Sequence, residues 1–167
     1  EPEDYAEVAK QRGLKGIVVT DHNPADDDWS PSVRMSVAEL DTYIGMVDRA
    51  RVAWAGEVDI RLGIESDYIP GMEPWLEKLH CRASFHHVLG SVHPHLSDYK
   101  TRYYHDDMEA FQKTYFEHLA LAAETGLFDT IAHPDLVKNI SPLDWHIDRV
   151  MAFILPCLDR IARAGTA

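Results

Sequence analysis

The sequence predicts an α/β fold with a parallel sheet. Four short apolar segments rich in β-branched residues alternate with longer segments of helical spacing. This alternation is typical of βαβ units, whose parallel strands are buried beneath the connecting helices. Each apolar segment ends in, or is followed at once by, a histidine or an acidic residue. In parallel α/β folds functional groups gather at this carboxyl end of the strands, so the same segments also predict where a site lies.

The helices are predicted from apolar spacing and from residues typical of helix ends. Glycine, the residue most common just past a helix, follows four of them. Ser36 and Glu39 have the spacing of a capping box at the start of the second helix. Pro156 is expected to kink or interrupt the last helix. The predicted helices are residues 3–12, 36–55, 75–80, 107–125 and 144–163.

The strands are predicted from short β-branched or alternating apolar runs bounded by polar residues. They are residues 15–20, 59–65, 87–92 and 127–132. A loop rich in Asp and Pro is expected at 23–35, between the first strand and the second helix. The order of elements is therefore helix and strand in turn along the whole chain.

Composition favours one globular domain over residues 1–167. The chain is 46% hydrophobic and 26% charged, with a formal net charge of −12. That much apolar sequence can form a core, and no low-complexity tract points to disorder. The negative charge disfavours binding to long nucleic acids or to anionic membranes. It is compatible with bound cations, which would offset clustered carboxylates.

The cysteines and the absence of long apolar runs predict a cytoplasmic protein. Cys81 and Cys157 are far apart and form no CxxC pair, so no disulfide framework or zinc finger is expected. No apolar run approaches the roughly 20 residues that span a bilayer. The chain starts with Glu1 and shows no signal peptide, so processing or trimming of its start is expected.

The residues after the four strands have the chemistry of a metal site. They are Asp21 and His22 after the first strand, then Glu65, His93 and His133. Neighbouring strands lie roughly 5 Å apart, so side chains just past their ends can converge. Imidazole and carboxylate groups together bind zinc, manganese or iron. A carboxylate can also bridge two metals, which makes Glu65 the expected bridging ligand.

Each of these residues also has a simpler interpretation. A single histidine after a strand is more often structural, Asp21 and His22 can cap a turn, and Glu65 can pair with an arginine. Four coincidences at one topological position favour the shared metal site. Other chemistries have little support, because the chain has no GxSxG, GxxxxGK[ST] or GxGxxG motif.

The remaining histidines are predicted to be structural or solvated. His80 and His118 lie on predicted helices, and His86 and His87 precede the third strand at the wrong end for the site. His95 is two residues past His93 and could face the same pocket.

Four motifs in order resemble the polymerase and histidinol phosphatase (PHP) family, and most closely its histidinol-phosphatase-like branch. They are "GLKGIVVTDHNP", "LGIESDY", "VLGSVH" and "GLFDTIAHPDLVK". The similarity covers nearly the whole chain. It implies a distorted, TIM-like (β/α)7 barrel with up to three divalent metal ions at the carboxyl ends of its strands.

The resemblance also implies roles for individual residues. The metal ligands would be His22 of "DH", Glu65 of "GIE", His93 of "SVH" and His133, with Glu65 bridging two metals. Asp21 would orient its neighbours and, with Glu65, belong to the catalytic machinery.

Further polar residues receive weaker assignments from the same resemblance. Arg34 resembles an arginine that meets the substrate phosphate. Ser91 and Asp135 are expected to support the ligands.

The chain departs from the family pattern at both ends. The family begins with an HxH motif on its first strand and ends with a "SDAH"-like motif on a further strand; this chain is expected to start after the first and to stop before the second. Its 167 residues also fall short of the roughly 250 of a full barrel. The expectation is therefore a partial barrel, truncated at both ends. Its open strand edges would favour association, including a homo-oligomer.

The resemblance implies a metal-dependent phosphoric monoester hydrolase. A metal-activated water would attack a small substrate such as L-histidinol phosphate, a step of histidine biosynthesis. One alternative is a PHP-type nuclease or nucleotide phosphoesterase. Another is a catalytically incomplete domain with a structural or regulatory role, which the missing terminal motifs favour.

Overall fold

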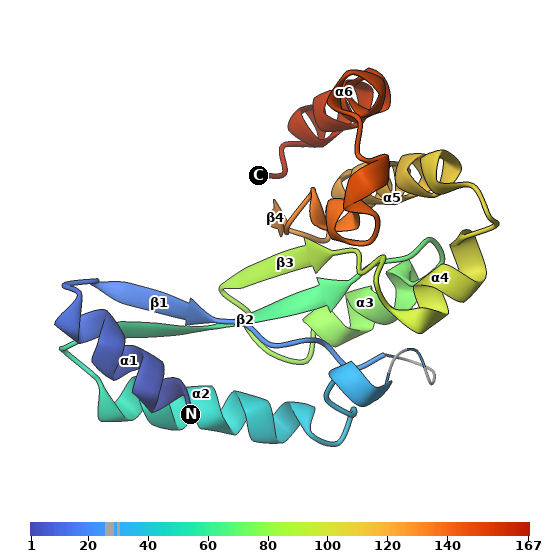
Figure 1. Cartoon of the computed structure of the whole chain (residues 1–167). Coiled ribbons are helices and arrows are strands. Elements are labelled where there is room, and N and C mark those ends of the chain that lie inside the picture. Colours follow the sequence, from blue (N-terminus) through green and yellow to red (C-terminus); the bar gives the residue numbers. More distant parts are fainter. Residues whose placement is uncertain (26–28, 30) are drawn as a thin grey trace.

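The four predicted strands form one parallel sheet. The computed structural model describes residues 1–25, 29 and 31–167, and the strand order in it is β1-β2-β3-β4. All neighbouring strands pair in parallel (Figure 1). The strands are β1 (Gly16–Val19), β2 (Asp59–Asp67), β3 (His87–Ser91) and β4 (Thr130–Ile131). The parallel α/β prediction is confirmed.

The helices largely follow the prediction. They are α1 (Pro2–Gln11), α2 (Leu40–Ala53), α3 (Glu73–His80), α4 (Ser97–Tyr103), α5 (Met108–Glu124) and α6 (Ile147–Ala164), with short 3-10 turns at Pro31–Val33, Leu136–Asn139 and Pro142–Asp144. Helix α4 was predicted as loop. Its sequence is polar and it buries only Tyr99, so it has no apolar periodicity to detect.

Several predicted boundaries were wrong. Helix α2 begins at Leu40 and not at Ser36, although Glu39 does accept hydrogen bonds from the backbone N–H and the hydroxyl of Ser36, both at 2.8 Å. The regular ladder of β4 covers two residues where six were expected. In the loop predicted at 23–35, residues 26–28 and 30 lie outside the described part of the chain.

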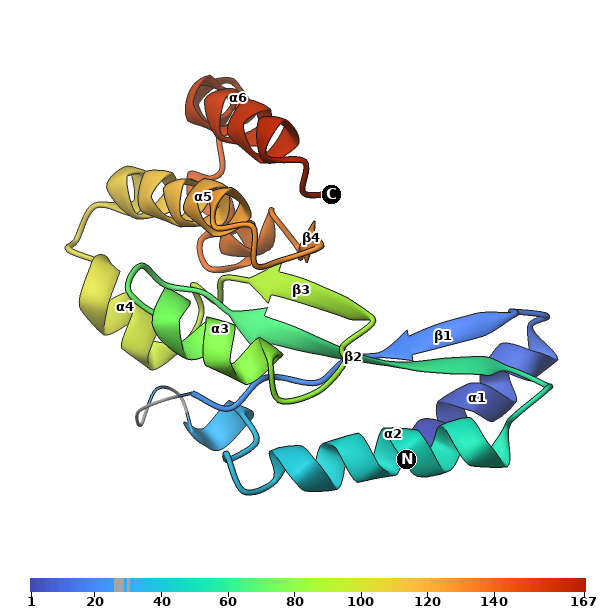
Figure 2. The same ribbon diagram turned by 180° about the vertical axis from the view of Figure 1, so that it is seen from behind.

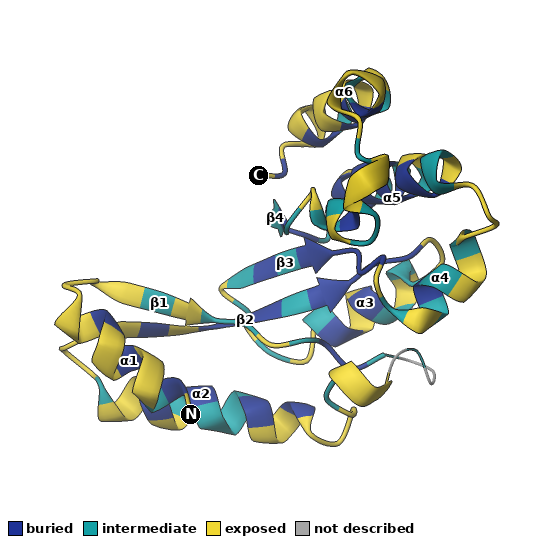
Figure 3. Ribbon diagram, in the orientation of Figure 1, coloured by how far each residue is buried: buried dark blue, intermediate teal, exposed yellow. Residues whose placement is uncertain are grey.

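The helices pack along the sheet in sequence order. Helices α1 and α2 lie beside β1 and β2, while α5 and α6 lie at the β4 end, and the view from behind shows the same arrangement (Figures 1 and 2). Burial is concentrated in β2, β3 and the inner face of α5 (Figure 3). None of the described helices is long and apolar enough to cross a bilayer.

Strand β2 holds the sheet together and positions the site. Its first half pairs with β1 and its second half with β3. An isolated parallel bridge then places His22 opposite Glu65, so the chain continues alongside β2 after β1 has ended. The bridge consists of hydrogen bonds from Glu65 N–H to the Asp21 carbonyl at 3.0 Å and from Asn23 N–H to the Glu65 carbonyl at 2.9 Å.

Gly63 lies where β2 passes from one partner to the other, and it has no room for a side chain. A Cβ atom there would lie 2.6 Å from Val18 Cγ1 and 2.9 Å from the carbonyl oxygen of His87. The neighbouring strands can therefore approach β2 this closely only because residue 63 is glycine.

Candidate metal centre

Three side chains from different strand ends converge on one point. Glu65 is on β2, His93 follows β3 and His133 follows β4. The Nε2 atoms of His93 and His133 lie 3.3 and 3.1 Å from the same oxygen, Oε1 of Glu65. Their ligand atoms all lie within 4.8 Å of one another. The strand ends thus bring together the donors that the sequence predicted.

The backbone at His133 adopts an unusual conformation. Its φ is 31°, in the left-handed region that few residues other than glycine adopt. The buried hydroxyl of Tyr115, on α5, donates to the His133 carbonyl at 2.9 Å, and the Leu136 N–H donates to it at 3.1 Å. Such strain persists only where surrounding contacts support it, and it is common at functional sites.

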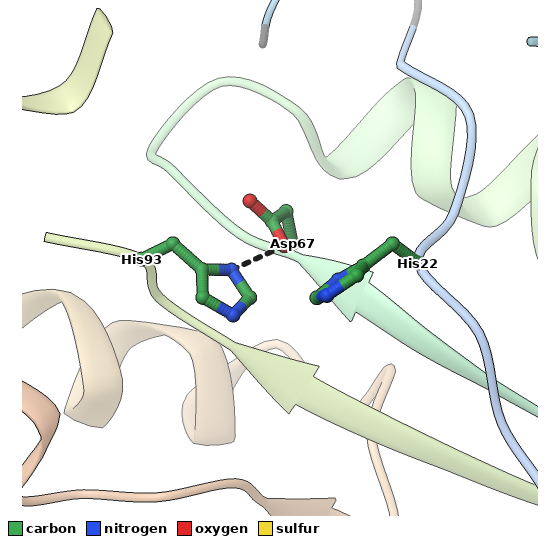
Figure 4. A group of neighbouring side chains, drawn as sticks. All are labelled: His22, Asp67 and His93. Carbon is green, nitrogen blue, oxygen red and sulfur yellow. Dashed lines mark hydrogen bonds and ion pairs between the residues drawn. The ribbon is translucent and has the colours of Figure 1, made fainter. Parts of the chain in front are cut away.

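A second group overlaps the first and contains His22, Asp67 and His93. Figure 4 shows these side chains facing one another from the loop after β1, the end of β2 and the chain after β3. The His93 Nδ1–H donates to Oδ1 of Asp67 at 2.7 Å. The rings of His22 and His93 pack edge to face, 5.0 Å between centroids. His93 therefore belongs to both groups.

A buried polar network surrounds Asp67. Its Oδ2 atom accepts from the guanidinium of Arg34, and its Oδ1 also accepts from the Ser91 hydroxyl at 3.1 Å. The Asp67 N–H donates to Oδ1 of Asn23 at 2.8 Å, and the same oxygen accepts from Arg34 at 3.2 Å. Arg34 and Ser91 thus contact the carboxylate of Asp67, and Asn23 contacts its backbone.

Contacts within the site shift the pKa values of its carboxylates and of His93. Burial tends to raise the pKa of Glu65, but hydrogen bonds from His133 and His93 lower it well below its usual range. Burial also tends to raise the pKa of Asp67, but the hydrogen bond with His93 and the charge of Arg34 lower it. Burial tends to lower the pKa of His93, but its bonds to Asp67 and Glu65 raise it to about 9.

The first group fits a divalent metal ion. Two ligands bound tetrahedrally to zinc at about 2.0–2.1 Å lie roughly 3.3–3.4 Å apart. The Glu65 to His93 and Glu65 to His133 separations of 3.3 and 3.1 Å are close to this. In the second group, Nδ1 of His22 is buried and has no hydrogen-bond partner within the described part of the chain. Neutral imidazole nitrogens beside an ionised carboxylate are the donor set that zinc, iron and manganese accept.

The predicted site residues do not all lie in these groups. His22, Glu65, His93 and His133 do. Asp21 is exposed, and its Oδ1 accepts from the backbone N–H of His22 at 2.8 Å. The Arg34 side chain is buried in an ion pair with Asp67. The catalytic and substrate-binding roles assigned to Asp21 and Arg34 stay predictions.

Ser91 and Asp135, which were expected to support the ligands, lie in different surroundings. Ser91 contacts Asp67, as expected of a supporting residue. Asp135 is exposed and pairs with Lys138.

Sequence reasoning missed Asp67 and Asn23. Asp67 is two residues after Glu65 on the same strand, so both side chains project from one face of β2. That spacing was visible in "GIESDY", but the strand was predicted to end at Glu65. Asn23 has no periodic signal, because it is an asparagine in a loop.

The other histidines lie where the sequence placed them. The ring of His118 is buried, with Nδ1 2.8 Å from the Tyr99 hydroxyl, and burial lowers its pKa to about 4. His86 and His87 are at the amino end of β3, near Arg61 and Thr130 respectively. His95 is exposed, and its ring packs against that of His93 at 5.5 Å.

The chain matches the PHP domain family over residues 1–166. It is 33% identical to a protein of Deinococcus radiodurans named "Probable histidinol-phosphatase", an alignment that covers 99% of this chain and 65% of that protein. A protein of the same name from Schizosaccharomyces pombe is 26% identical, with 90% of this chain and 51% of that protein covered.

A solved structure shares the fold. It is the crystal structure of histidinol phosphate phosphatase from Lactococcus lactis subsp. lactis, complexed with zinc, L-histidinol and phosphate. The TM-score is 0.76 at 19% identity, and the match covers 98% of this chain and 62% of that one. The likeness confirms the prediction of a partial TIM-like barrel of the PHP type. This chain therefore spans about two thirds of the length of these relatives, or less.

Proposed function

The chain belongs to the PHP domain family, and we propose that its strand-end cluster forms part of the active site of a metal-dependent phosphomonoesterase. The proposed substrate is L-histidinol phosphate or a similarly small phosphomonoester. One observation carries the proposal: Glu65 Oε1 lies within 3.3 Å of Nε2 of both His93 and His133 at the carboxyl end of the sheet. The relatives named as histidinol-phosphatases and the complex of the Lactococcus enzyme support the choice of substrate.

The chain's own residues would hold the metal and keep it in place. His93 and His133 would contribute imidazole nitrogens and Glu65 its carboxylate, a group that can also serve a second metal. Divalent ions held there would lower the pKa of a bound water and neutralise charge on the phosphoryl oxygens. The lowered pKa of Glu65 keeps its carboxylate ionised across the neutral range, as a ligand must be.

The number and identity of the metals are part of the proposal. His22 would contribute to a further metal beside the first, because its ring lies 5.0 Å from that of His93. Up to three ions follow from the family resemblance, with zinc, manganese or iron as candidates. Zinc in the complex of the Lactococcus enzyme makes it the first ion to test.

We propose a cytoplasmic location and, from the open strand edges, a homo-oligomer. The free cysteines Cys81 and Cys157 suit a reducing compartment. Size-exclusion chromatography with light scattering would test the oligomeric state.

Substitution of Glu65 tests the proposed function. Glu65→Gln keeps the shape of the side chain but removes the negative charge that both histidines approach. We expect phosphate release from L-histidinol phosphate to fall at least about 100-fold, because the change removes a metal ligand, and bound metal to fall with it. His86→Gln, an exposed histidine at the other end of β3, is the matched control and should change neither.

Full turnover in Glu65→Gln would refute the assignment. A substrate panel separates the alternatives: hydrolysis of oligonucleotides or nucleoside monophosphates in preference to L-histidinol phosphate would support the nuclease or nucleotide phosphoesterase branch. No hydrolysis of any of them by metal-loaded protein would support the structural role.

A further inference from the structure

A network of buried polar contacts leads to His93, one of the proposed metal ligands. It runs from Asn23 and Arg34 to Asp67, and from Asp67 to His93. These residues come from the loop after β1, the turn before α2, the end of β2 and the segment after β3. The network thus connects four segments to one imidazole ring.

The Arg34–Asp67 ion pair is almost completely withdrawn from water. The side chains are 2% and 4% exposed. Removing one partner from such a pair leaves an uncompensated buried charge, which is strongly unfavourable. Arg34 is therefore held by Asp67, and its guanidinium also donates to Asn23 Oδ1 at 3.2 Å. Arg34 therefore supports the site through its contacts with Asp67 and Asn23.

Both oxygens of Asp67 are already used by donors from the chain. Oδ1 accepts from His93 Nδ1–H at 2.7 Å and from the Ser91 hydroxyl at 3.1 Å, and Oδ2 accepts from Arg34. An ionised carboxylate only accepts hydrogen bonds, so it keeps the proton of His93 on Nδ1. The other ring nitrogen, Nε2, is then the one that faces Glu65.

We propose that Asp67 and Arg34 are positioning residues, which together fix the orientation and the tautomer of His93 for metal binding. The proposal rests on the proposed function of Glu65, His93 and His133 as the metal site. Asp67 orients the ring directly, and Arg34 holds Asp67 in place through the buried ion pair. Arg34 acts through Asp67 and needs no contact with the substrate phosphate.

Zinc affinity is the first test. Loss of a carboxylate that orients a histidine ligand typically costs 10–100-fold in metal affinity. We expect Asp67→Asn and Arg34→Met to weaken zinc binding by about that factor in competition with a chromophoric chelator. Zinc stoichiometry at saturation should stay unchanged, because no ligand is lost. Asp59→Asn and Arg61→Met are matched controls, since they break an exposed ion pair on the same strand.

The tautomer of His93 provides a readout that does not depend on activity. Long-range ¹H–¹⁵N spectra of the zinc-loaded protein should show His93 bound through Nε2 with a proton on Nδ1. In Asp67→Asn we expect a second population or a broadened signal, because the neutral amide holds that proton less strongly. The controls should retain the wild-type signal.

The variants also separate positioning from the two other roles. If Asp67 is itself a ligand, Asp67→Asn will lose one zinc per chain at saturation. If Arg34 binds the phosphate, Arg34→Lys will raise KM while zinc affinity stays at the wild-type value. Either result overturns the proposal, whereas partial recovery of zinc affinity in Arg34→Lys relative to Arg34→Met supports it.

A folding defect would not obscure the result. The double variant Arg34→Met, Asp67→Asn removes both buried charges and so avoids the unpaired one. If it folds and binds zinc within twofold of wild type, the proposal is wrong. Failure of the proposed function alone would appear differently, as normal zinc binding and a normal His93 signal without phosphate release.

Discussion

His93 connects the two groups of candidate ligands. Its Nδ1–H donates to Asp67, and its Nε2 faces Glu65. In the metal-free protein this places an imidazolium between two carboxylates, and its pKa rises to about 9 from an ordinary value near 6.5.

The stability of the metal-free protein should therefore depend on pH through this residue. A raised pKa means that folding favours the protonated form, so the contribution is complete below about pH 6.5 and is lost as pH rises to about 9. We expect the destabilisation caused by His93→Asn to be largest at pH 6 and smaller by on the order of 2 kcal/mol at pH 9. Denaturant unfolding in the presence of a chelator measures this difference.

His118→Asn is the control for that experiment. The pKa of His118 is lowered to about 4 by burial, so this ring is neutral throughout the range from pH 6 to 9. Its contribution to the free energy of unfolding should not change across that range. An equally constant effect of His93→Asn would contradict the assignment of the proton to His93.

At the scale of elements, β2 does most to build the site. It contributes Glu65 and Asp67 from one face, pairs with β1 and β3 in turn, and holds His22 opposite Glu65. Gly63 lies at the change of partner, two residues before Glu65. The packing at Gly63 therefore affects the position of the ligand as well as the stability of the sheet.

Gly63→Ala should damage both properties. The added Cβ would meet Val18 Cγ1 at 2.6 Å and backbone of β3 at 2.9 Å, so the strands must separate. We expect a loss of about 1–3 kcal/mol in the free energy of unfolding, typical of overpacking, together with weaker zinc binding. Chemical denaturation and zinc competition measure the two effects.

Gly45→Ala is the matched control. Gly45 is within α2, and an added Cβ would have no neighbour closer than 3.9 Å. It should stabilise the protein by roughly 0.5–1 kcal/mol, because alanine favours helix, and leave zinc binding unchanged. If both glycine variants behave alike, the close approach at Gly63 does not matter for the site.

Sequence patterns were sufficient for the elements that carry the ligands. The ligand candidates near the carboxyl ends of β1, β2, β3 and β4 could be identified because a histidine or glutamate at the end of an apolar run is a local signal. Asp67 was missed because the exact end of a strand depends on pairing with β3, which reaches Ser91. The burial of Arg34 was missed for a similar reason, since its partner is 33 residues away in the chain.

At the scale of the whole molecule, the open parallel sheet places every candidate ligand at one end. The four strands are neighbours in chain order, so their carboxyl ends lie along one edge of the sheet. Side chains as far apart in the sequence as His22 and His133 therefore lie close to Glu65 and His93. The chain spans 65% of the length of its Deinococcus relative. The sheet edge at β4 is partly paired by Ala167, which exchanges hydrogen bonds with Asp129 and Ile131.

The most direct test of the account is anomalous diffraction at the zinc edge from crystals of the zinc-loaded, active protein. We predict a zinc ion bound by Glu65 Oε1, His93 Nε2 and His133 Nε2, with Asp67 still bonded to His93 Nδ1 and outside the coordination shell. An active protein with zinc elsewhere, or with no zinc at these three atoms, would contradict the central claim.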